Sequence, residues 1–201
     1  MIKHTKVRQL CFLAIFCTIS IILNYIEMLF PIYLGIPGAK LGLANIVSLT
    51  ILLCFGFKYA VGVALLRIFI IGITFTNPYM MLYSLVGGLL SISIMALMVK
   101  TDLFSNIVIS IIGGVSHNIG QLLVAFVFFS TSVFIYYLPY LILLGIVSGT
   151  VVGIIAQIIY IKIKLLFCKW VVIIRLFTMF RAHCISISHS FWRQNCHFYK
   201  F

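Results

Sequence analysis

The sequence predicts an all-α membrane protein of six transmembrane helices, with the N-terminus and the C-terminus both in the cytoplasm. The chain is 64% hydrophobic and only 8% charged, whereas an average soluble domain is roughly 45–50% apolar and about 25% charged. Six apolar segments reach or approach the length that crosses a bilayer, about 20 helical residues, and positive charge is concentrated near the two ends of the chain. A soluble fold of 201 residues has too little interior to bury so much apolar surface, so we expect the chain to lie in lipid.

The first helix is expected over residues 9–30. A cytoplasmic segment, residues 1–8, precedes it and contains Lys3, Lys6 and Arg8. A basic start followed by an apolar run is also typical of a signal peptide, but this run contains no small-residue cleavage site. We therefore expect the helix to be retained in the membrane.

The other five helices are expected where apolar runs are separated by glycine, proline or polar residues. Lys58 follows the second run, Asn77 and Pro78 open the fourth, and the polar loop KTDLFSN precedes the fifth. The second run is the shortest. The expected helices cover residues 41–56, 59–76, 79–99, 107–130 and 134–161.

These helices form an expected transmembrane domain, residues 9–161, which is followed by a basic cytoplasmic tail, residues 162–201. In the tail, the stretch CKWVVIIRLFTMFR is apolar but too short to span a membrane, so we predict an interfacial helix followed by a disordered end. The cysteines and histidines of the tail match no zinc-finger spacing, and we expect no metal site among His183, Cys184, His189, Cys196 and His197.

The distribution of positive charge sets the expected orientation. The chain has 14 Lys and Arg against two acidic residues, and most of these cations fall in the first eight residues, at Lys58, at Lys100 or in the tail. Placing the N-terminus inside puts all of them in the cytoplasm and leaves Lys40 in an outer loop, in agreement with the positive-inside rule. This arrangement favours anionic lipid over nucleic acid as the partner of the basic flanks and predicts a multi-pass protein of the cytoplasmic membrane.

Polar side chains at membrane depth mark the candidate site. Ionisable groups there are costly and usually face a bundle interior or a water-filled cavity. In the expected topology they lie between the middle of the membrane and its outer surface, together with several carboxamides. The candidate binding residues are Glu27, Asn45, Arg67, His117, Asn118 and Gln121.

Structural explanations for the same residues remain open. Glu27 and Arg67 are also compatible with a structural ion pair, and His117 with a packing histidine that is bonded to a neighbouring helix. Asn and Gln between membrane helices often serve as interhelical hydrogen-bond partners. However, Gly113, His117 and Gln121 share one helical face, where small residues leave room for a ligand or for another helix. The bias of the polar groups towards one half of the membrane favours a site.

Several kinds of chemistry are excluded by what the sequence lacks. The acidic residues are Glu27 and Asp102 alone, on opposite sides of the membrane in the expected topology. Paired-carboxylate catalysis and an aspartate-rich Mg²⁺ site are therefore excluded. No GxxxxGK[ST] loop is present to bind ATP, and no serine has a histidine and an acid suitably placed for a triad. We expect no enzymatic activity, no cofactor and no bound metal.

Small residues on two helices suggest close helix packing or the docking of a partner membrane protein. In the sixth segment three glycines recur at intervals of four residues, and in the first segment an alanine and a threonine do the same. The candidate docking residues are Ala14, Thr18, Gly145, Gly149 and Gly153.

Five stretches of the sequence resemble one family of small bacterial membrane proteins: GAKLGLANIVSL, LLRIFIIG, YSLVGGLLSI, HNIGQLLVA and YYLPYLILLGIVSGTVVG. The resemblance covers about residues 9–161. The family is described as the Gx transporter family and as heptaprenyl diphosphate synthase component I. The first description implies a six-helix bundle like the substrate-binding S components of energy-coupling factor transporters. Such a protein captures a nutrient from outside and docks on a transmembrane coupling subunit driven by ATPases.

The second description implies a non-catalytic membrane subunit of a prenyl diphosphate synthase that makes the menaquinone side chain. The residues favour substrate capture, because the polar cluster faces outward and no diphosphate–Mg²⁺ site is present. In this hypothesis the loop 31–40 caps an outward cavity, Arg67 and Lys40 attract an anionic nutrient, and Glu27 binds a donor or orients Arg67. The alternative is the prenyl synthase subunit.

Overall fold

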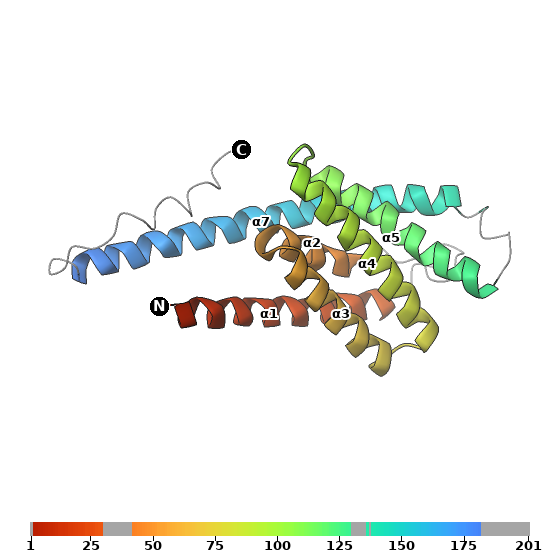
Figure 1. Ribbon diagram of the computed structural model, residues 1–201, viewed down its shortest axis with the longest axis horizontal. Coiled ribbons are helices and arrows are strands. Elements are labelled where there is room, and N and C mark those ends of the chain that lie inside the picture. Colours follow the sequence, from red (N-terminus) through yellow and green to blue (C-terminus); the bar gives the residue numbers. More distant parts are fainter. Residues whose placement is uncertain (1, 30–41, 130–135, 137, 182–201) are drawn as a thin grey trace. The chain divides into compact units, whose positions relative to one another are not determined.

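The computed structural model describes residues 2–29, 42–129, 136 and 138–181, which lie in helices or in the short turns between them (Figure 1). No strand occurs in these residues, so the predicted all-α class is confirmed. The chain divides into two compact units, Met1–Ile161 and Lys162–Phe201. The first unit contains the candidate site. In the second, the described residues are helical as far as Arg181.

Six helices make up the described part of the chain, and each overlaps one of the predicted segments. Their order along the sequence is followed in Figure 1 by colour, from red to blue. The bounds are α1 Ile2–Leu29, α2 Leu43–Phe55, α3 Phe57–Thr74, α4 Pro78–Thr101, α5 Asn106–Phe129 and α7 Leu138–Arg181.

Five of these helices are long and apolar enough to cross a membrane; the exception is α2. With 13 residues and a rise of about 1.5 Å per residue, α2 is about 20 Å long, shorter than a hydrocarbon core of about 30 Å. The described helices therefore indicate a multi-pass membrane protein. The exact number of crossings and the cytoplasmic position of both termini remain predictions.

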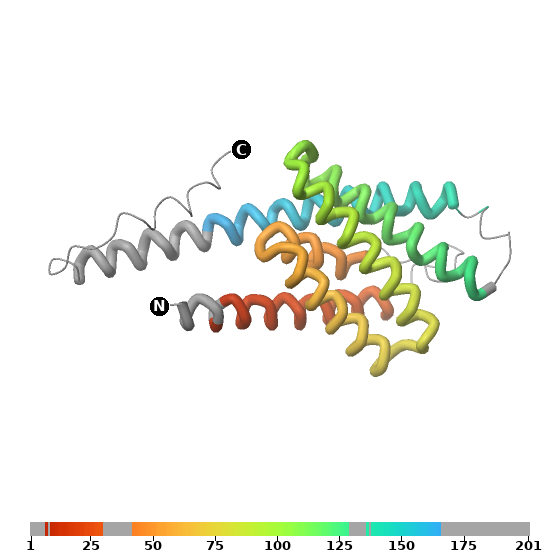
Figure 2. Tube along the Cα trace, viewed as in Figure 1, coloured from red at the N-terminus to blue at the C-terminus, as the bar shows by residue number. Residues whose placement is uncertain are grey.

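Local sequence explains where the helices begin and end. The side chain of Asn77 accepts a hydrogen bond of 2.9 Å from the backbone N–H of Met80 and caps α4, and Pro78 occupies the first turn, where its missing N–H costs nothing. Gly56 alone separates α2 from α3 and has φ +91°, a conformation that glycine adopts without strain. Figure 2 shows the resulting tight turn.

The last helix is longer than predicted. The sequence predicts a sixth segment that ends at residue 161 and a separate interfacial helix after it, whereas α7 continues without interruption from Leu138 to Arg181. The physical reason is that the sequence contains no glycine or proline after Gly153, so nothing local breaks the helix. The predicted domain limits at residues 8 and 161 and the disordered end of the tail stay predictions, and residues 182–201 lie outside the described part of the chain.

The short helix α2 forms the centre of the first unit. It contacts α1, α3 and α4, and Leu49 and Ile51 are 1% and 0% exposed. Its buried side chains belong to one apolar cluster that also includes Met95 of α4 and Val152 of α7. Because α2 is covered on most sides by protein, its environment is the interior of the bundle.

Glycines allow the backbones of α5 and α7 to approach closely. A Cβ added to Gly114 would lie 2.6 Å from the carbonyl oxygen of Gly145, and one added to Gly149 would lie 2.7 Å from Cα of Ile111. A Cβ on Gly153 would meet Ser110 of α5 at 2.9 Å. The glycine stripe predicted as a partner-docking surface is therefore occupied by α5 of the same chain, and we do not propose it further for docking.

Candidate functional site

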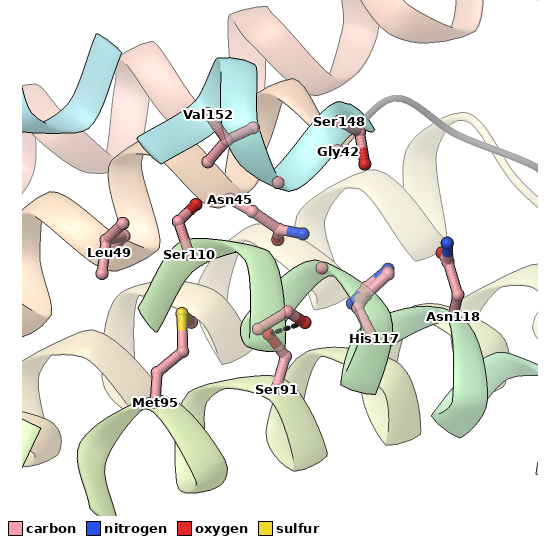
Figure 3. Close-up of a pocket in the computed structure, with 13 residues that line it drawn as sticks. Gly42, Asn45, Leu49, Ser91, Met95, Ser110, His117, Asn118, Ser148 and Val152 are labelled. Carbon is pink, nitrogen blue, oxygen red and sulfur yellow. Dashed lines mark hydrogen bonds between the residues drawn. The ribbon is translucent and has the colours of Figure 1, made fainter. Parts of the chain in front are cut away.

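A small cavity lies between helices α2, α4, α5 and α7 of the first unit (Figure 3). In Figure 3 the amide of Asn45 extends from α2 towards α5, with Ser110 and His117 on either side of it. Its wall contains both apolar and polar residues, which are Gly42, Asn45, Leu49, Ser91, Met95, Ser110, Gly113, Gly114, His117, Asn118, Ser148, Gly149 and Val152.

The cavity has room for about one water molecule. Its free volume is about 10 Å³ for the centre of a water-sized sphere, close to the minimum of about 10–15 Å³ that a buried water requires. A ligand larger than a water molecule therefore requires the walls to move apart.

The glycines of α5 explain why so little space remains. A Cβ on Gly113 would collide with the Met95 side chain of α4, and one on Gly120 would lie 2.8 Å from Cα of Gly87, also in α4. Together with the contact of Gly114 on α7, these glycines are used to bring neighbouring helices close to α5. Small residues on this face therefore mainly serve packing, which was one of the alternatives that the sequence left open.

His117 and Gln121 form a buried polar pair one helical turn apart on α5. The amide nitrogen of Gln121 lies 3.2 Å from Nε2 of His117. The amide donates to Nε2 when the imidazole carries its proton on Nδ1. His117 lines the cavity, whereas Gln121 does not. Gln121 thus acts on the site by fixing the ring of His117.

Two further hydrogen bonds hold the walls of the cavity in place. The side-chain amide of Asn118 donates to the carbonyl oxygen of Leu141 in α7 over 2.8 Å. The hydroxyl of Ser91 in α4 donates to the carbonyl oxygen of Gly113 over 2.8 Å, which is the dashed line in Figure 3. Both bonds connect α5 to a neighbouring helix, so each polar group has a structural role besides facing the cavity.

Glu27 is connected to the cavity by a hydrogen bond from the backbone of Gly42. The backbone N–H of Gly42 donates to Oε1 of Glu27 over 2.5 Å, and Gly42 lines the cavity just before α2 begins. Gly42 has φ +73°, and a Cβ there would lie 3.0 Å from Nδ2 of Asn45. The carboxylate therefore joins the end of α1 to one edge of the cavity without lining it.

Arg67 lies in a different polar layer, between α3 and α1. Its side chain is only 4% exposed, and its charge interacts with Glu27 and Cys17 of α1. Ser20 and Asn24, which follow Cys17 on the same stripe of α1, are buried as well. Nε of Arg67 has no hydrogen-bond partner in the described residues. Because helix pairs α1–α2 and α1–α3 are in contact, this layer is the interior seam along which α1 attaches.

The six predicted site residues therefore fall into two groups. Asn45, His117 and Asn118 face one cavity, and Gln121 supports them from behind. Glu27 and Arg67 belong to the seam of α1. Lys40 and the predicted lid, residues 31–40, lie outside the described residues.

Sequence reasoning missed three serines of the cavity wall: Ser91, Ser110 and Ser148. Serine is common in membrane helices, so an isolated serine gives little signal. Its spacing from other polar residues gives slightly more, because Ser110 and His117 are two turns apart on α5 and so share a face. No group of three or more possible metal ligands occurs in the described residues.

Comparison with known families gives one match. The family model described as heptaprenyl diphosphate synthase component I matches residues 16–159, which is more than half of the chain. The matched region begins within α1 and ends within α7, so it includes every residue that lines the cavity. A search of curated proteins gave no match.

Proposed function

The chain belongs to the heptaprenyl diphosphate synthase component I family, and we propose that it binds a small molecule within the membrane as the substrate-binding component of an uptake transporter. The observation that carries this proposal is the convergence of Asn45, His117 and Asn118, from two helices, on one cavity. Polar side chains at membrane depth are costly unless they face a partner or a site. Here they surround a space that is not filled by protein.

The small size of the cavity is compatible with such a role. Solute-binding sites often assemble around the ligand, and the apparent affinity then includes the free energy of opening. Met95 forms part of the wall, and an unbranched methionine side chain rearranges more easily than a branched one. We expect ligand entry to displace Met95 and to separate α2 from α5.

A transport role requires a membrane partner, because the chain has no ATP-binding loop of its own. We propose a transmembrane coupling subunit with its ATPases as that partner and the Ala14–Thr18 face of α1 as its docking surface. Both residues are exposed, and the Thr18 hydroxyl donates to the carbonyl oxygen of Ala14 over 3.0 Å. The face therefore presents small side chains whose polar group is already satisfied, which suits close helix packing.

Ligand binding is tested with the purified chain in nanodiscs by a thermal-shift screen of small nutrients. Binding raises the apparent melting temperature by mass action. We expect one ligand class to do this for the native chain and for Leu66→Ala, whose side chain is 57% exposed, but not for Asn45→Ala or His117→Ala. A ligand whose effect survives both cavity substitutions would contradict the assignment of the site.

The second candidate is a non-catalytic membrane subunit of a prenyl diphosphate synthase. It is favoured by the description of the matched family and is compatible with a chain that has two acidic residues, too few to hold Mg²⁺ on a diphosphate. Affinity purification from native membranes distinguishes the two. Recovery of a prenyl synthase subunit, without any ligand in the thermal-shift screen, would favour this candidate over substrate capture.

A further inference from the structure

The wall of the cavity contains six polar side chains beside its apolar ones, and no Lys, Arg, Asp or Glu of the described residues lines it. Its polar side chains both donate and accept hydrogen bonds, and His117 pairs with Gln121. The polar members of the wall are Asn45, Ser91, Ser110, His117, Asn118 and Ser148.

The charges at the same depth lie elsewhere and act on each other. Arg67 is buried against α1, and Glu27 is the acidic group that favours its charge. Glu27 in turn accepts the N–H of Gly42. Neither side chain lines the cavity. An anion that entered the cavity would therefore lose its hydration without meeting a cation of the described residues there, which is strongly unfavourable in a low-dielectric interior.

Two polar groups of the wall have hydrogen-bonding capacity left over. The hydroxyl of Ser110 is buried, with the residue 2% exposed, and has no partner in the described part of the chain. The amide of Asn45 projects between Ser110 and His117 (Figure 3) and makes no hydrogen bond within the described residues. By contrast, Ser91 is already bonded to Gly113 and Asn118 to Leu141. A buried polar group without a partner is costly, so Ser110 is the position where a ligand gains most. The amide of Asn45, which is half-buried, offers a second hydrogen-bonding group beside it.

From this arrangement we propose that the cavity recognises an uncharged ligand group that both donates and accepts hydrogen bonds, such as a hydroxyl or a carboxamide, bound by Asn45 and Ser110. The inference rests on the proposed ligand-binding function and deepens it. It replaces the anionic ligand that Arg67 suggested from sequence, and it assigns Arg67 and Glu27 to the attachment of α1.

The charge preference of the cavity is tested without any ligand by placing a carboxylate in it. Asn45→Asp replaces the amide with a group of nearly the same shape. The substitution is made in the native chain and in a Glu27→Gln, Arg67→Met background, which removes both charges of the seam. Asn45→Leu, an uncharged substitution, is the control. The apparent melting temperature is measured at pH 8 in nanodiscs.

We expect Asn45→Asp to lower the melting temperature by the same amount, about 5 °C or more, in both backgrounds, and by more than Asn45→Leu. If the aspartate is tolerated in the native chain and destabilises only when Arg67 is absent, Arg67 supplies a cation to the cavity and the proposal is wrong. If Asn45→Asp does not fold in either background while Asn45→Leu folds, the cavity rejects the charge and the proposal holds.

A second measurement uses matched probes, acetamide and acetate, at equal concentration. We expect acetamide to raise the melting temperature, and Ser110→Ala to reduce that shift at least about threefold. A shift with acetate that is lost in the background without Arg67 would overturn the proposal. If neither probe has an effect, the ligand-binding function itself is in doubt, whereas the aspartate experiment still decides the charge preference.

Discussion

Gly149 is a residue at which the addition of a single methyl group should strongly destabilise the bundle. A Cβ there would lie 2.7 Å from Cα of Ile111 and 2.9 Å from the carbonyl oxygen of Ser110. Both atoms are backbone and cannot rotate away. We expect Gly149→Ala to lower the free energy of unfolding by about 1–3 kcal/mol, the usual cost of overpacking, as measured by denaturation in mixed micelles.

Gly62 provides the matched control for this prediction. It also lies in a helix, α3, but a Cβ there would meet nothing within 4 Å. Gly62→Ala should therefore leave stability unchanged or raise it by up to about 1 kcal/mol, because alanine is the better helix former. Equal effects of the two substitutions would refute the close approach of α5 and α7.

Asn118 supplies the other residue-scale prediction. Its amide donates to Leu141 across the same pair of helices, and hydrogen bonds between membrane helices contribute about 0.5–1.5 kcal/mol. We expect Asn118→Ala to destabilise the chain by that amount. Asn118→Asp should cost more, since a carboxylate cannot donate to the carbonyl oxygen and repels it. A neutral effect of both changes in the same denaturation assay would count against this bond.

At this scale the sequence predicts which residues are unusual but not which neighbours they meet. Glu27, Arg67 and His117 stand out because ionisable groups are rare at membrane depth, and the sequence alone assigns all three to one site. The structure separates them, because Arg67 faces α1 while His117 lines the cavity and its ring lies close to Gly87 of α4. The facing of a side chain depends on the rotation of its helix in the bundle, which packing fixes and depth along the sequence does not.

At the scale of elements, α2 differs from its neighbours in being enclosed by protein. Leu49 of α2 is 1% exposed, whereas Leu66 of α3 is 57% exposed and faces the expected lipid. We expect Leu49→Ala to cost about 2–5 kcal/mol, as in a buried core, and Leu66→Ala much less, because the lipid fills the space. If Leu66→Ala proves as costly as Leu49→Ala in the denaturation assay, Leu66 faces protein and α3 has an unseen partner.

The extents of the helices could be predicted closely where the chain carries its own stop signals. Asn77 and Pro78 begin α4 as expected, and a single glycine separates α2 from α3. The predicted end of α7 is wrong because it rests on charge, which does not end a helix. The lysines at 162 and 164 favour an interface with water, but they are good helix formers.

For the whole molecule, the testable feature is the side of the membrane on which each turn lies. If α2 counts as a crossing and the N-terminus is inside, the turn after α3 is outside and the turn after α4 is inside. The test uses Thr74→Cys and Leu103→Cys, both at exposed positions, in a chain whose six native cysteines are replaced. A membrane-impermeant maleimide should label the Thr74→Cys variant in intact cells and the Leu103→Cys variant only after permeabilisation.

The reverse labelling pattern would mean that α2 does not cross the membrane or that the orientation is inverted. The sequence predicts the topology from charge alone, because Lys58 and Lys100 fall in turns that should share one side. The sequence also predicts that the second segment is the shortest, but it does not predict that protein encloses this helix. Inside the bundle, α2 carries Asn45 to the cavity.

The glycine ladder of α7 has a consequence for the way the bundle finds its register. Glycines repeat at 145, 149 and 153, so the surface that α7 offers to α5 looks nearly the same after a slide of one turn, about 5.4 Å. The contacts of the glycines alone therefore do not distinguish the two alignments. The hydrogen bond from Asn118 to the carbonyl oxygen of Leu141 lies beside these glycines. It forms in one alignment of the two helices and therefore fixes their register. Without this hydrogen bond, we expect α7 to be able to shift along α5 by one turn. Such a shift would move Ser148 and Val152 out of the cavity wall.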